Sequence, residues 1–591
     1  MSASDIFDVI QTEKQSSVDE PPFLDKQWVR LPDQQFGQYG SNRVTFDLSS
    51  LFSASQYYNW QDAYLSIPIV NVLSVSNNGT AITTDLSLNN LYSMGMKAGY
   101  YQIFDSVSLS IDDRTIVNHA THKVPFYTSF KLVTSMSTDD LNTIAPQIGY
   151  ARDSATSWTY NAAASASGIG QCNNSGLMTA TTVGGGAVSA AGTFGEAYNR
   201  GMEQRTSFIA QSPASTRWQS IYGNSSAIVE SVFKTQGKSY SKVVQNGATA
   251  VNSYVVQYIF AQVRLRDILA VFADLPCTHG LNAKLELLTN CFTQQITIAN
   301  NTNMSTSNAQ TQSPYGMTPL MVASAAVAAT PPTAGLQLPA ANVAAVNIGT
   351  YIATPLPTSI FGTAAHHGVG GLNVPAHPQT QCFFHVPRIS PQPEVLSRWL
   401  TMTEKTVHYD DILSCSYSNL GAGATLSNFV ISQGVQNAKG LLVLCHINAA
   451  SNGNITQAMS PFDTAPSTTA PICLSQFQCT VGGQPIFASG PVNYDSDLFL
   501  QQLSGANSIN AGKVMGLTSG MLSKAEYEFG CYKYIYVDLT RRPTDSMVPL
   551  SIAISGTNPS LLAIDVWCFT ILNKSITINP LTGQLLATSA V

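Results

Sequence analysis

A glycine–lysine segment near residue 510 offers the first possible chemistry, which is phosphate binding. Gly505 is followed by Gly512-Lys513-Val514. A P-loop needs Gly-x4-Gly-Lys-Ser/Thr, because its backbone N–H groups and its lysine hold the phosphates while its hydroxyl group holds Mg²⁺. Here Asn507 stands in the place of the first glycine and Val514 replaces the hydroxyl residue. The segment is therefore interpreted as a turn and not as a nucleotide site.

Five histidines lie close enough in sequence for metal binding to be considered. His366-His367 and His377 share a segment rich in glycine and proline, with no carboxylate or cysteine nearby, and His119 and His122 follow an expected strand. Neither group has the regular H-x3-H spacing of a zinc site. Both are interpreted as exposed histidines, so the sequence predicts no metal site and no bound cofactor.

Two pairs of adjacent acids, Asp112-Asp113 and Asp410-Asp411, could suggest acid–base catalysis. Neighbouring residues on a strand point to opposite faces, so such a pair cannot act on one substrate atom, and Asp112-Asp113 fits a turn better. The chain contains neither the G-x-S-x-G motif of hydrolases nor the H-E-x-x-H motif of metalloproteases. We therefore expect no catalytic residues, although two acids distant in sequence could still form a glycosidase pair.

Two groups of basic residues suggest contacts with a partner and not catalysis. Lys234, Lys238 and Lys242 recur every four residues, so a helix would place them on one face, either solvated or against an acidic partner. Arg541-Arg542 follows a tyrosine-rich segment and suits a carboxylate contact within or between chains. The glycosylation sequons that begin at Asn78 and Asn454 are interpreted as loop composition only.

The overall composition excludes several classes of protein. Of 591 residues only 10% are charged, the formal net charge is −6, and 44% are hydrophobic. The chain is too apolar for a disordered protein, and it lacks the basic excess of a nucleic-acid binder. Residues 287–387 and 154–195 contain no Asp, Glu, Lys or Arg, yet neither stretch has the run of about 18 apolar residues that would span a membrane.

The N-terminal residues and the cysteines indicate a soluble protein of a reducing compartment. The segment MSASDIFDVIQTEK at the start of the chain lacks the apolar core of a secretory signal. The ten cysteines include no C-x-x-C pair, and Cys382, Cys445, Cys479 and Cys568 lie in apolar runs. We expect buried free thiols and no disulfide framework.

Alternation of apolar and polar residues with a period of two dominates the chain and predicts an all-β protein. The clearest alternation lies in residues 43–48, 65–69, 107–111, 283–287, 532–539, 564–569 and 575–578, with weaker strands expected at 317–324 and 343–349. The parity flips between Leu474 and Phe477, which predicts a β-bulge, and Gly482-Gly483 predicts a tight hairpin turn.

Helical spacing is confined to residues 124–134, 267–275 and 393–400. Short strands separated by turns favour a β-sandwich, and one sandwich needs only about 100 to 200 residues. The length therefore favours two sandwiches with long loops.

Several sequence blocks, in this order, resemble the double jelly-roll major capsid proteins of Polinton-like viruses and virophages. The blocks are NRVTFDLSSL (42–51), AYLSIPI (63–69), VRLRDILAVFADLP (263–276), GLNAKLEL (280–287), CFFHVPRISPQPEVLSRWL (382–400), KTVHYDD (405–411), FQCTVGGQPIF (477–487), YIYVDLTRRP (534–543) and IDVWCFTILNKSITINPLTG (564–583). Their number and order make the resemblance specific, although no single block is a fingerprint.

The resemblance implies an all-β fold of two tandem eight-stranded jelly rolls with long loops and a few short helices. We expect an N-terminal arm at residues 1–38, a first jelly roll at 39–350 and a second at 351–591. Within the first jelly roll, we expect a long insert at about 154–200 and a weakly structured segment at 298–350.

The resemblance further implies a major capsid protein without enzymatic activity, located in the virion and assembled inside the host cell. Its copies would form pseudo-hexameric homotrimers that tile an icosahedral shell around a double-stranded DNA genome. Expected partners are neighbouring trimers, penton proteins and minor capsid proteins, with no sequence-specific DNA binding and no membrane span. Two other hypotheses remain: a β-rich adhesin or lectin-like protein that binds glycans, and a β-sandwich glycoside hydrolase with two unidentified carboxylates.

Overall fold

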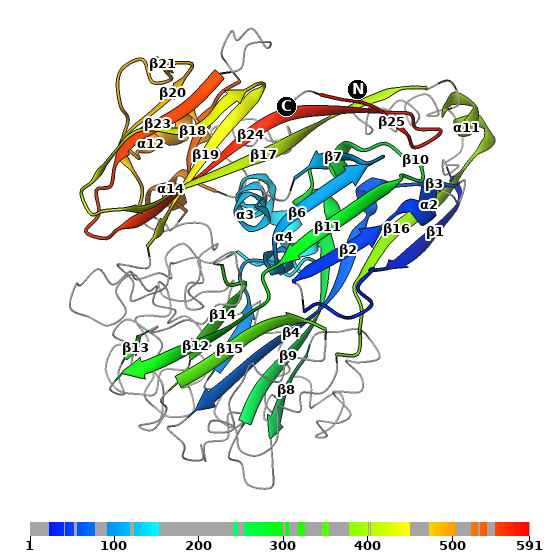
Figure 1. Cartoon of the computed structure of the whole chain (residues 1–591), viewed down its shortest axis with the longest axis horizontal. Helices are drawn as coiled ribbons and strands as arrows, with labels where there is room; N and C mark the ends of the chain where they lie inside the picture. The colour runs from blue at the N-terminus through cyan, green and yellow to red at the C-terminus, as the bar shows by residue number, and fades with distance from the viewer. Residues whose placement is uncertain are drawn as a thin grey trace.

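The computed structural model describes the greater part of the chain. The described residues are 23–40, 42–52, 56–76, 92–118, 123–152, 240–245, 253–299, 303–305, 317–324, 345–353, 377–399, 401, 403–448, 472–503, 522–529, 532–540 and 550–589. They form two β-sandwiches that lie side by side, with a helix between them (Figure 1).

Eight strands of the first sandwich form two antiparallel sheets. One sheet contains, in spatial order, β1 (Phe23–Pro32), β16 (Phe383–Pro391), β4 (Tyr64–Ser76) and β9 (Ser253–Arg264). The other contains β2 (Arg43–Asp47), β11 (Ala283–Thr289), β6 (Phe104–Ile111) and β7 (Arg114–Val117). Counted along the chain, the two orders are 1-8-3-6 and 2-7-4-5, which is the arrangement of a jelly roll.

The second sandwich repeats this arrangement. One sheet contains β17 (Lys405–Leu420), β24 (Ile564–Ile578), β19 (Ala438–Ile447) and β22 (Ile535–Asp538). The other contains β18 (Thr425–Val435), β23 (Leu550–Thr557), β20 (Ser475–Val481) and β21 (Gln484–Pro485). The orders are again 1-8-3-6 and 2-7-4-5. The predicted all-β fold of two tandem jelly rolls is confirmed.

Strand pairing moves the expected domain boundaries. Phe23 is the register partner of Pro391 and Pro32 that of Phe383, so β1 and β16 are the first and last strands of the first jelly roll. Residues 23–38 therefore do not belong to a separate arm, and the expected division at 350/351 would cut β16 from its sheet. We place the boundary between β16 and β17 instead. Residues 1–22 and the whole of the expected insert at 154–200 lie outside the described residues.

Further strands extend the first sandwich or pair apart from it. They are β3 (Tyr57–Tyr58), β5 (Tyr92–Met96), β8 (Tyr240–Gln245), β10 (Thr278–His279), β12 (Phe292–Ala299), β13 (Asn303–Ser305), β14 (Leu320–Ser324) and β15 (Ala345–Ile352). β15 pairs with β4 and continues through β12 to β13, whereas β14 pairs with β5 in a separate sheet. The strands expected at 317–324 and 343–349 are thus present, although only the second joins the sandwich.

The described helices are short. They are α2 (Ser49–Phe52), α3 (Val124–Ser135), α4 (Thr138–Thr143), α8 (Leu265–Ile268), α9 (Val271–Asp274), α11 (Pro393–Trp399), α12 (Ser496–Gln501), α14 (Lys524–Phe529) and the 3-10 turns η1 (Trp60–Asp62) and η2 (Tyr100–Ile103). The predicted helices at 124–134 and 393–400 are confirmed. The one expected at 267–275 is divided, because Leu269 has extended dihedral angles (φ −132°, ψ 105°) and ends α8.

Two local predictions in the second sandwich are also confirmed. The register between β20 and β23 shifts between Ser475 and Gln478, where Gln476 has a φ of +50°, and this is the expected bulge. Gly482 and Gly483 join β20 to β21 with φ values of +59° and +80°. Positive φ at both central residues is the geometry of a tight hairpin turn, which glycine adopts without strain.

Each sandwich has an apolar interior, and a third apolar layer joins the two. In the first sandwich Phe46 and Phe384 meet across the sheets, with ring centroids 6.0 Å apart. The second interior contains Phe477, Ile554 and the expected thiols of Cys445, Cys479 and Cys568, which are buried and free. Cys382 is likewise buried and free in the first sandwich. The C-terminal hairpin of β24 and β25 (Leu585–Thr588) lies over the first sandwich, where the Leu585 N–H donates to Asp112 Oδ2 (2.8 Å).

Candidate functional site

The adjacent acids on β17 are separated by the strand, as predicted. Asp410 accepts hydrogen bonds from the Lys439 ammonium on β19 (3.0 Å), and Asp411 forms an ion pair with Lys574 on β24 (2.6 Å). Burial raises the pKa of Asp410 above its usual value, and the Lys439 charge opposes that rise. Each carboxylate thus has its own ammonium partner on a different neighbouring strand, which is the arrangement of a structural ion pair and not of a catalytic dyad.

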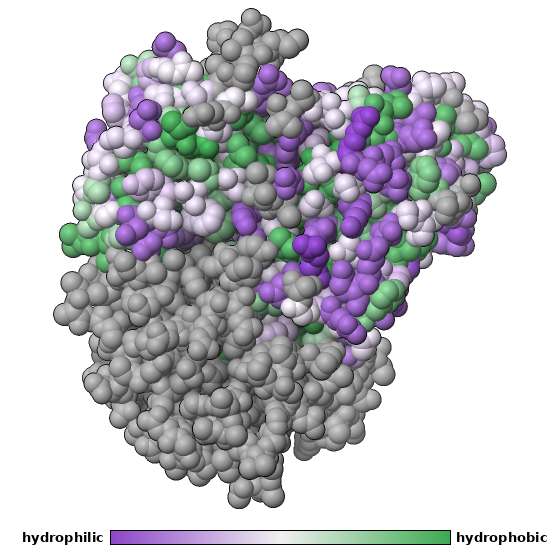
Figure 2. All heavy atoms as spheres, in the orientation of Figure 1, coloured by the Kyte–Doolittle hydropathy of each residue, from purple (hydrophilic) through white to green (hydrophobic). Residues whose placement is uncertain are grey.

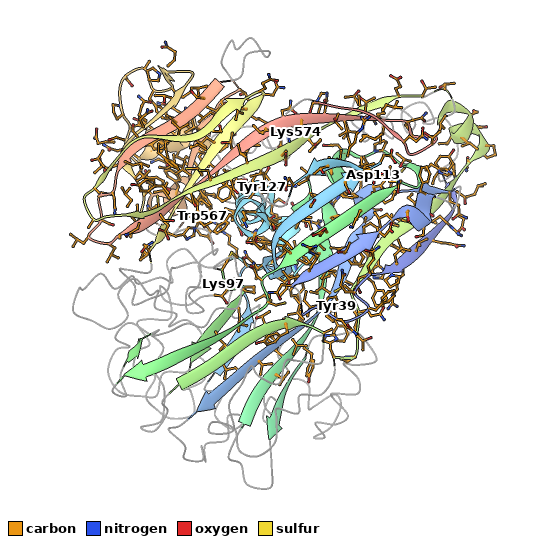
Figure 3. The ribbon with its side chains drawn as sticks, viewed as in Figure 1. Tyr39, Lys97, Asp113, Tyr127, Trp567 and Lys574 are labelled. Carbon is orange, nitrogen blue, oxygen red and sulfur yellow. The ribbon has the colours of Figure 1, made fainter. Side chains whose placement is uncertain are left out.

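Lys574→Met is expected to lower the free energy of unfolding by about 2–3 kcal/mol, because it leaves the Asp411 carboxylate buried without its ammonium. The Lys574 side chain (labelled in Figure 3) is 16% exposed. The loss of stability is therefore smaller than for a fully buried ion pair. Urea denaturation provides the measurement. The double variant Lys574→Met/Asp411→Leu should recover most of the loss, and a double variant no more stable than the single one would contradict this assignment.

The other residues considered for chemistry are dispersed. Asp112 and Asp113 have φ values of +47° and +60° and form the turn between β6 and β7, as expected. Lys242 lies in strand β8 opposite Val256, so the helical arrangement considered for the three lysines does not hold at this position. Several candidates lie outside the described residues, namely His119, His122, His366, His367, Gly505, Asn507, Gly512, Lys513, Val514, Lys234, Lys238, Arg541, Arg542, Asn78 and Asn454.

His377 is buried, which corrects the expectation of an exposed loop histidine. Its ring packs against Phe260, with centroids 4.7 Å apart, and its Nε2 lies 3.2 Å from the Ile259 carbonyl oxygen. Burial lowers the pKa of His377 to about 4. The ring is a neutral packing group. Within the described residues, no three His, Cys, Asp or Glu side chains gather in a way that could hold a metal ion.

An apolar junction joins the two sandwiches, and the sequence did not predict it. Helix α3 lies in it (Figure 1) and presents two phenylalanines to the second sandwich. The Phe126 ring is 5.1 Å from Trp567 and 5.5 Å from Phe569, and the Phe130 ring is 5.2 Å from Tyr534. The junction is therefore a shared core that holds the two jelly rolls together.

Polar contacts fix the position of this junction. Arg152 of the first sandwich forms an ion pair with Glu526 of α14 (2.7 Å) and lies over the Tyr532 ring. The partly buried Lys131 ammonium of α3 donates to the Arg266 carbonyl oxygen of α8 (2.8 Å), which ties α3 to the first sandwich, and burial lowers the pKa of this lysine. Buried polar groups keep their hydrogen bonds and ion pairs in only one arrangement. They therefore favour a single orientation of one sandwich relative to the other.

The two sheets of strand order 1-8-3-6, one in each sandwich, differ in how far their outer faces are buried. In the second sandwich, register partners Phe569, Leu442 and Tyr536 cross the sheet, and all three are buried under the α3 side of the first sandwich. In the first sandwich, the register partners His385 and Tyr64 cross the sheet β1-β16-β4-β9 and remain partly exposed. The outside of the second sheet is thus buried along this line. The outside of the first sheet is exposed only at β1 and the adjoining ends of β16 and β4, because further along that sheet His377 packs on Phe260.

The exposed part of this sheet presents aromatic rings and cations, and we call it the open face. It consists of Lys26, Trp28, Arg30, Tyr64, Phe383 and His385. Tyr64 stacks on His385 with centroids 4.6 Å apart, the Trp28 ring meets Tyr64 edge-on at 5.5 Å, and the Arg30 guanidinium lies 3.3 Å from the Phe383 ring.

The open face differs from the opposite sheet of the same sandwich. The outer face of β2, β11 and β6 is hydrophilic (Figure 2), with Arg43 and Glu286 in an ion pair at 2.9 Å. On the open face, by contrast, the Trp28 side chain is 52% exposed. Exposed aromatic area of this kind is typical of surfaces that bind other molecules.

Comparison with known proteins gives structural likenesses and no sequence match. No family model and no curated protein matches the chain. A chain of the Sputnik virophage, solved by cryo-EM, is 11% identical with a TM-score of 0.49, covering 98% of this chain and 90% of that one. The mavirus major capsid protein is 9% identical with a TM-score of 0.44, covering 98% and 92%.

A third structure, the Faustovirus major capsid protein, is 8% identical with a TM-score of 0.39, covering 96% of this chain and 94% of that one. The strand order of the chain itself, and not these likenesses, establishes the two jelly rolls. None of the described helices has the length and hydropathy needed to span a bilayer.

Proposed function

We propose that this chain is a major capsid protein, a structural and non-enzymatic protein that assembles as homotrimers with a six-sided outline. The trimers tile an icosahedral shell around a double-stranded DNA genome. The observation that carries the proposal is the pair of jelly rolls with the same strand order, held together by a shared apolar junction. Three such chains bring six similar sandwiches together, which suits a six-sided unit.

The composition supports a role in which copies bury surface against one another. Only 10% of the residues are charged, which lowers the desolvation cost of packing neighbouring copies. The net charge of −6 means that the chain does not neutralise DNA itself, so basic partner proteins would do so. The proposed location is the virion, after assembly inside the host cell, with penton and minor capsid proteins as further partners.

Electron microscopy of the overexpressed full-length chain tests the proposal. We expect trimers by light scattering and six-sided particles, hexagonal arrays or closed shells by negative stain. A chain that stays monomeric at all concentrations would contradict the proposal. Retention on a glycan column, or release of reducing sugar that stops when a carboxylate is mutated, would instead support a lectin or a hydrolase.

A further inference from the structure

In the part of the chain that the structure describes, the internal repeat shows one sheet whose outer face is buried and an equivalent sheet whose outer face is partly exposed, at the open face. The cover of the second sandwich comes from the connection between the fifth and sixth strands of the first, β7 and β9, because this connection contains α3. The equivalent connection of the second sandwich runs from β21 to β22 and contains α12 and α14. Among the described residues, no helix of this kind lies on the open face of the first sandwich.

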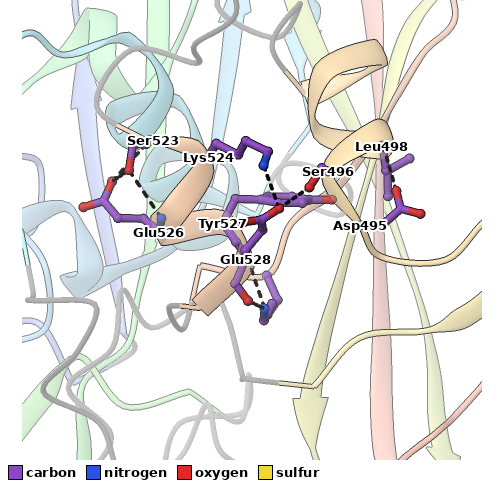
Figure 4. Close-up of polar contacts among 9 residues, drawn as sticks. Asp495, Ser496, Leu498, Ser523, Lys524, Glu526, Tyr527 and Glu528 are labelled. Carbon is purple, nitrogen blue, oxygen red and sulfur yellow. Dashed lines mark hydrogen bonds and ion pairs between the residues drawn. The ribbon is translucent and has the colours of Figure 1, made fainter.

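One side of the α12–α14 pair is already used within the chain. Phe499 and Tyr527 are buried in the shared core, and Ser496 donates to Glu528 so that the two helices are joined (Figure 4). Asp495 accepts the Leu498 N–H at 3.0 Å and caps α12. These contacts hold the pair as one rigid unit.

The other side of the pair faces solvent and is acidic. We call it the helical side, and it consists of Asp495, Asp497, Gln501, Lys524 and Ala525. Lys524 forms an ion pair with Glu528 at 3.1 Å, so its charge is already neutralised within the pair of helices. Asp497 is exposed and forms no ion pair with a described residue.

The open face has the complementary charge. Lys26 forms an ion pair with Asp62 at 3.2 Å, whereas Arg30 has no carboxylate partner among the described residues and lies on the Phe383 ring. A guanidinium that lies over an aromatic ring can still donate its N–H groups to a carboxylate. Around it, Trp28 and Tyr64 supply the aromatic area that forms the energetic centre of many interfaces.

We propose that the helical side of a second copy of this chain covers the open face, with Asp497 of that copy near Arg30. Within one chain, a helix of the first sandwich packs on the outer sheet face of the second. The proposed contact repeats this arrangement between two chains. It joins two different surfaces, and such heterologous contacts form a closed ring when the rotation between copies closes. This inference rests on the proposed function and names the surfaces by which its copies meet.

Photo-crosslinking tests which surface covers the open face. p-Benzoylphenylalanine is placed at position 28 of the full-length chain, and isotopically light and heavy chains are mixed before assembly and irradiation. We expect cross-links between light and heavy chains that map by mass spectrometry to residues 495–501 or 523–528. Oligomers that form without such cross-links, or with cross-links to another segment, would overturn this inference and leave the proposed function standing. A chain that stays monomeric would contradict both this inference and the proposed function.

Charge exchange provides an independent measurement. Arg30→Glu is expected to weaken self-association by about tenfold or more, and Asp497→Arg in the same chain is expected to restore most of it. Leu561→Glu is the matched control, because it places the same charge at an exposed position (84%) between β23 and β24 that belongs to neither surface. Circular dichroism confirms that each variant is folded. If Arg30→Glu and Leu561→Glu associate as the natural chain does, the open face is not the contact.

Discussion

Phe126→Ala is expected to lower the free energy of unfolding by about 3–5 kcal/mol, the usual cost of removing a buried phenylalanine ring. Phe126 is 3% exposed and lies among the rings of Trp567, Phe569 and His446, with centroids 5.1 to 5.5 Å away. These three residues belong to the second sandwich, whereas α3 belongs to the first. The cavity would therefore open in the layer that both sandwiches share.

The position of Phe126 also predicts how unfolding changes. Weakening the shared layer should uncouple the two jelly rolls, so that urea denaturation, followed by tryptophan fluorescence and circular dichroism, separates into two transitions. Leu561→Ala is the matched control, since that side chain is 84% exposed and should change stability by about 0.5 kcal/mol or less. An unchanged midpoint and a single transition for Phe126→Ala would show that α3 does not couple the sandwiches.

Period-two alternation predicted the β fold because it reports which side of a strand is buried. It worked best where one face meets the core and the other meets water, as in β11, where Ala283, Leu285 and Leu287 are buried and Lys284 is exposed. The strand β19 lacks alternation, because its apolar run GLLVLCHI (440–447) is buried on both faces. Such a run is the signature of a strand covered on both sides, and it was the available signal for the junction.

The sequence could not place β1, because its partner lies far along the chain. Residues 23–32 alternate poorly, and the strand that they pair with begins at residue 383. A pairing over such a separation depends on the closure of the whole sandwich and leaves little local pattern. For the same reason, the first jelly roll was expected to end before β16, and the open face on β1, β16 and β4 was not predicted.

His446→Phe is expected to reduce the loss of stability that the protein suffers in mild acid. His446 is buried in the junction, and neither of its ring nitrogens has a hydrogen-bond partner among the described residues. Burial, with a smaller contribution from the charge of Lys97, lowers its pKa to about 3. In the unfolded chain a histidine titrates near pH 6.5.

Between about pH 6.5 and about pH 3, the unfolded chain therefore binds a proton at His446 that the folded chain does not, and stability falls as the pH falls. The slope from one such histidine approaches about 1.4 kcal/mol per pH unit. Phenylalanine removes this slope and also the two unpartnered nitrogens, so the variant should be at least as stable at neutral pH. His377 and His385, whose pKa values are lowered to about 4, retain part of the acid sensitivity. Urea midpoints measured through this range provide the test, and parallel pH profiles for the natural chain and the variant would show that His446 is not held neutral in the junction.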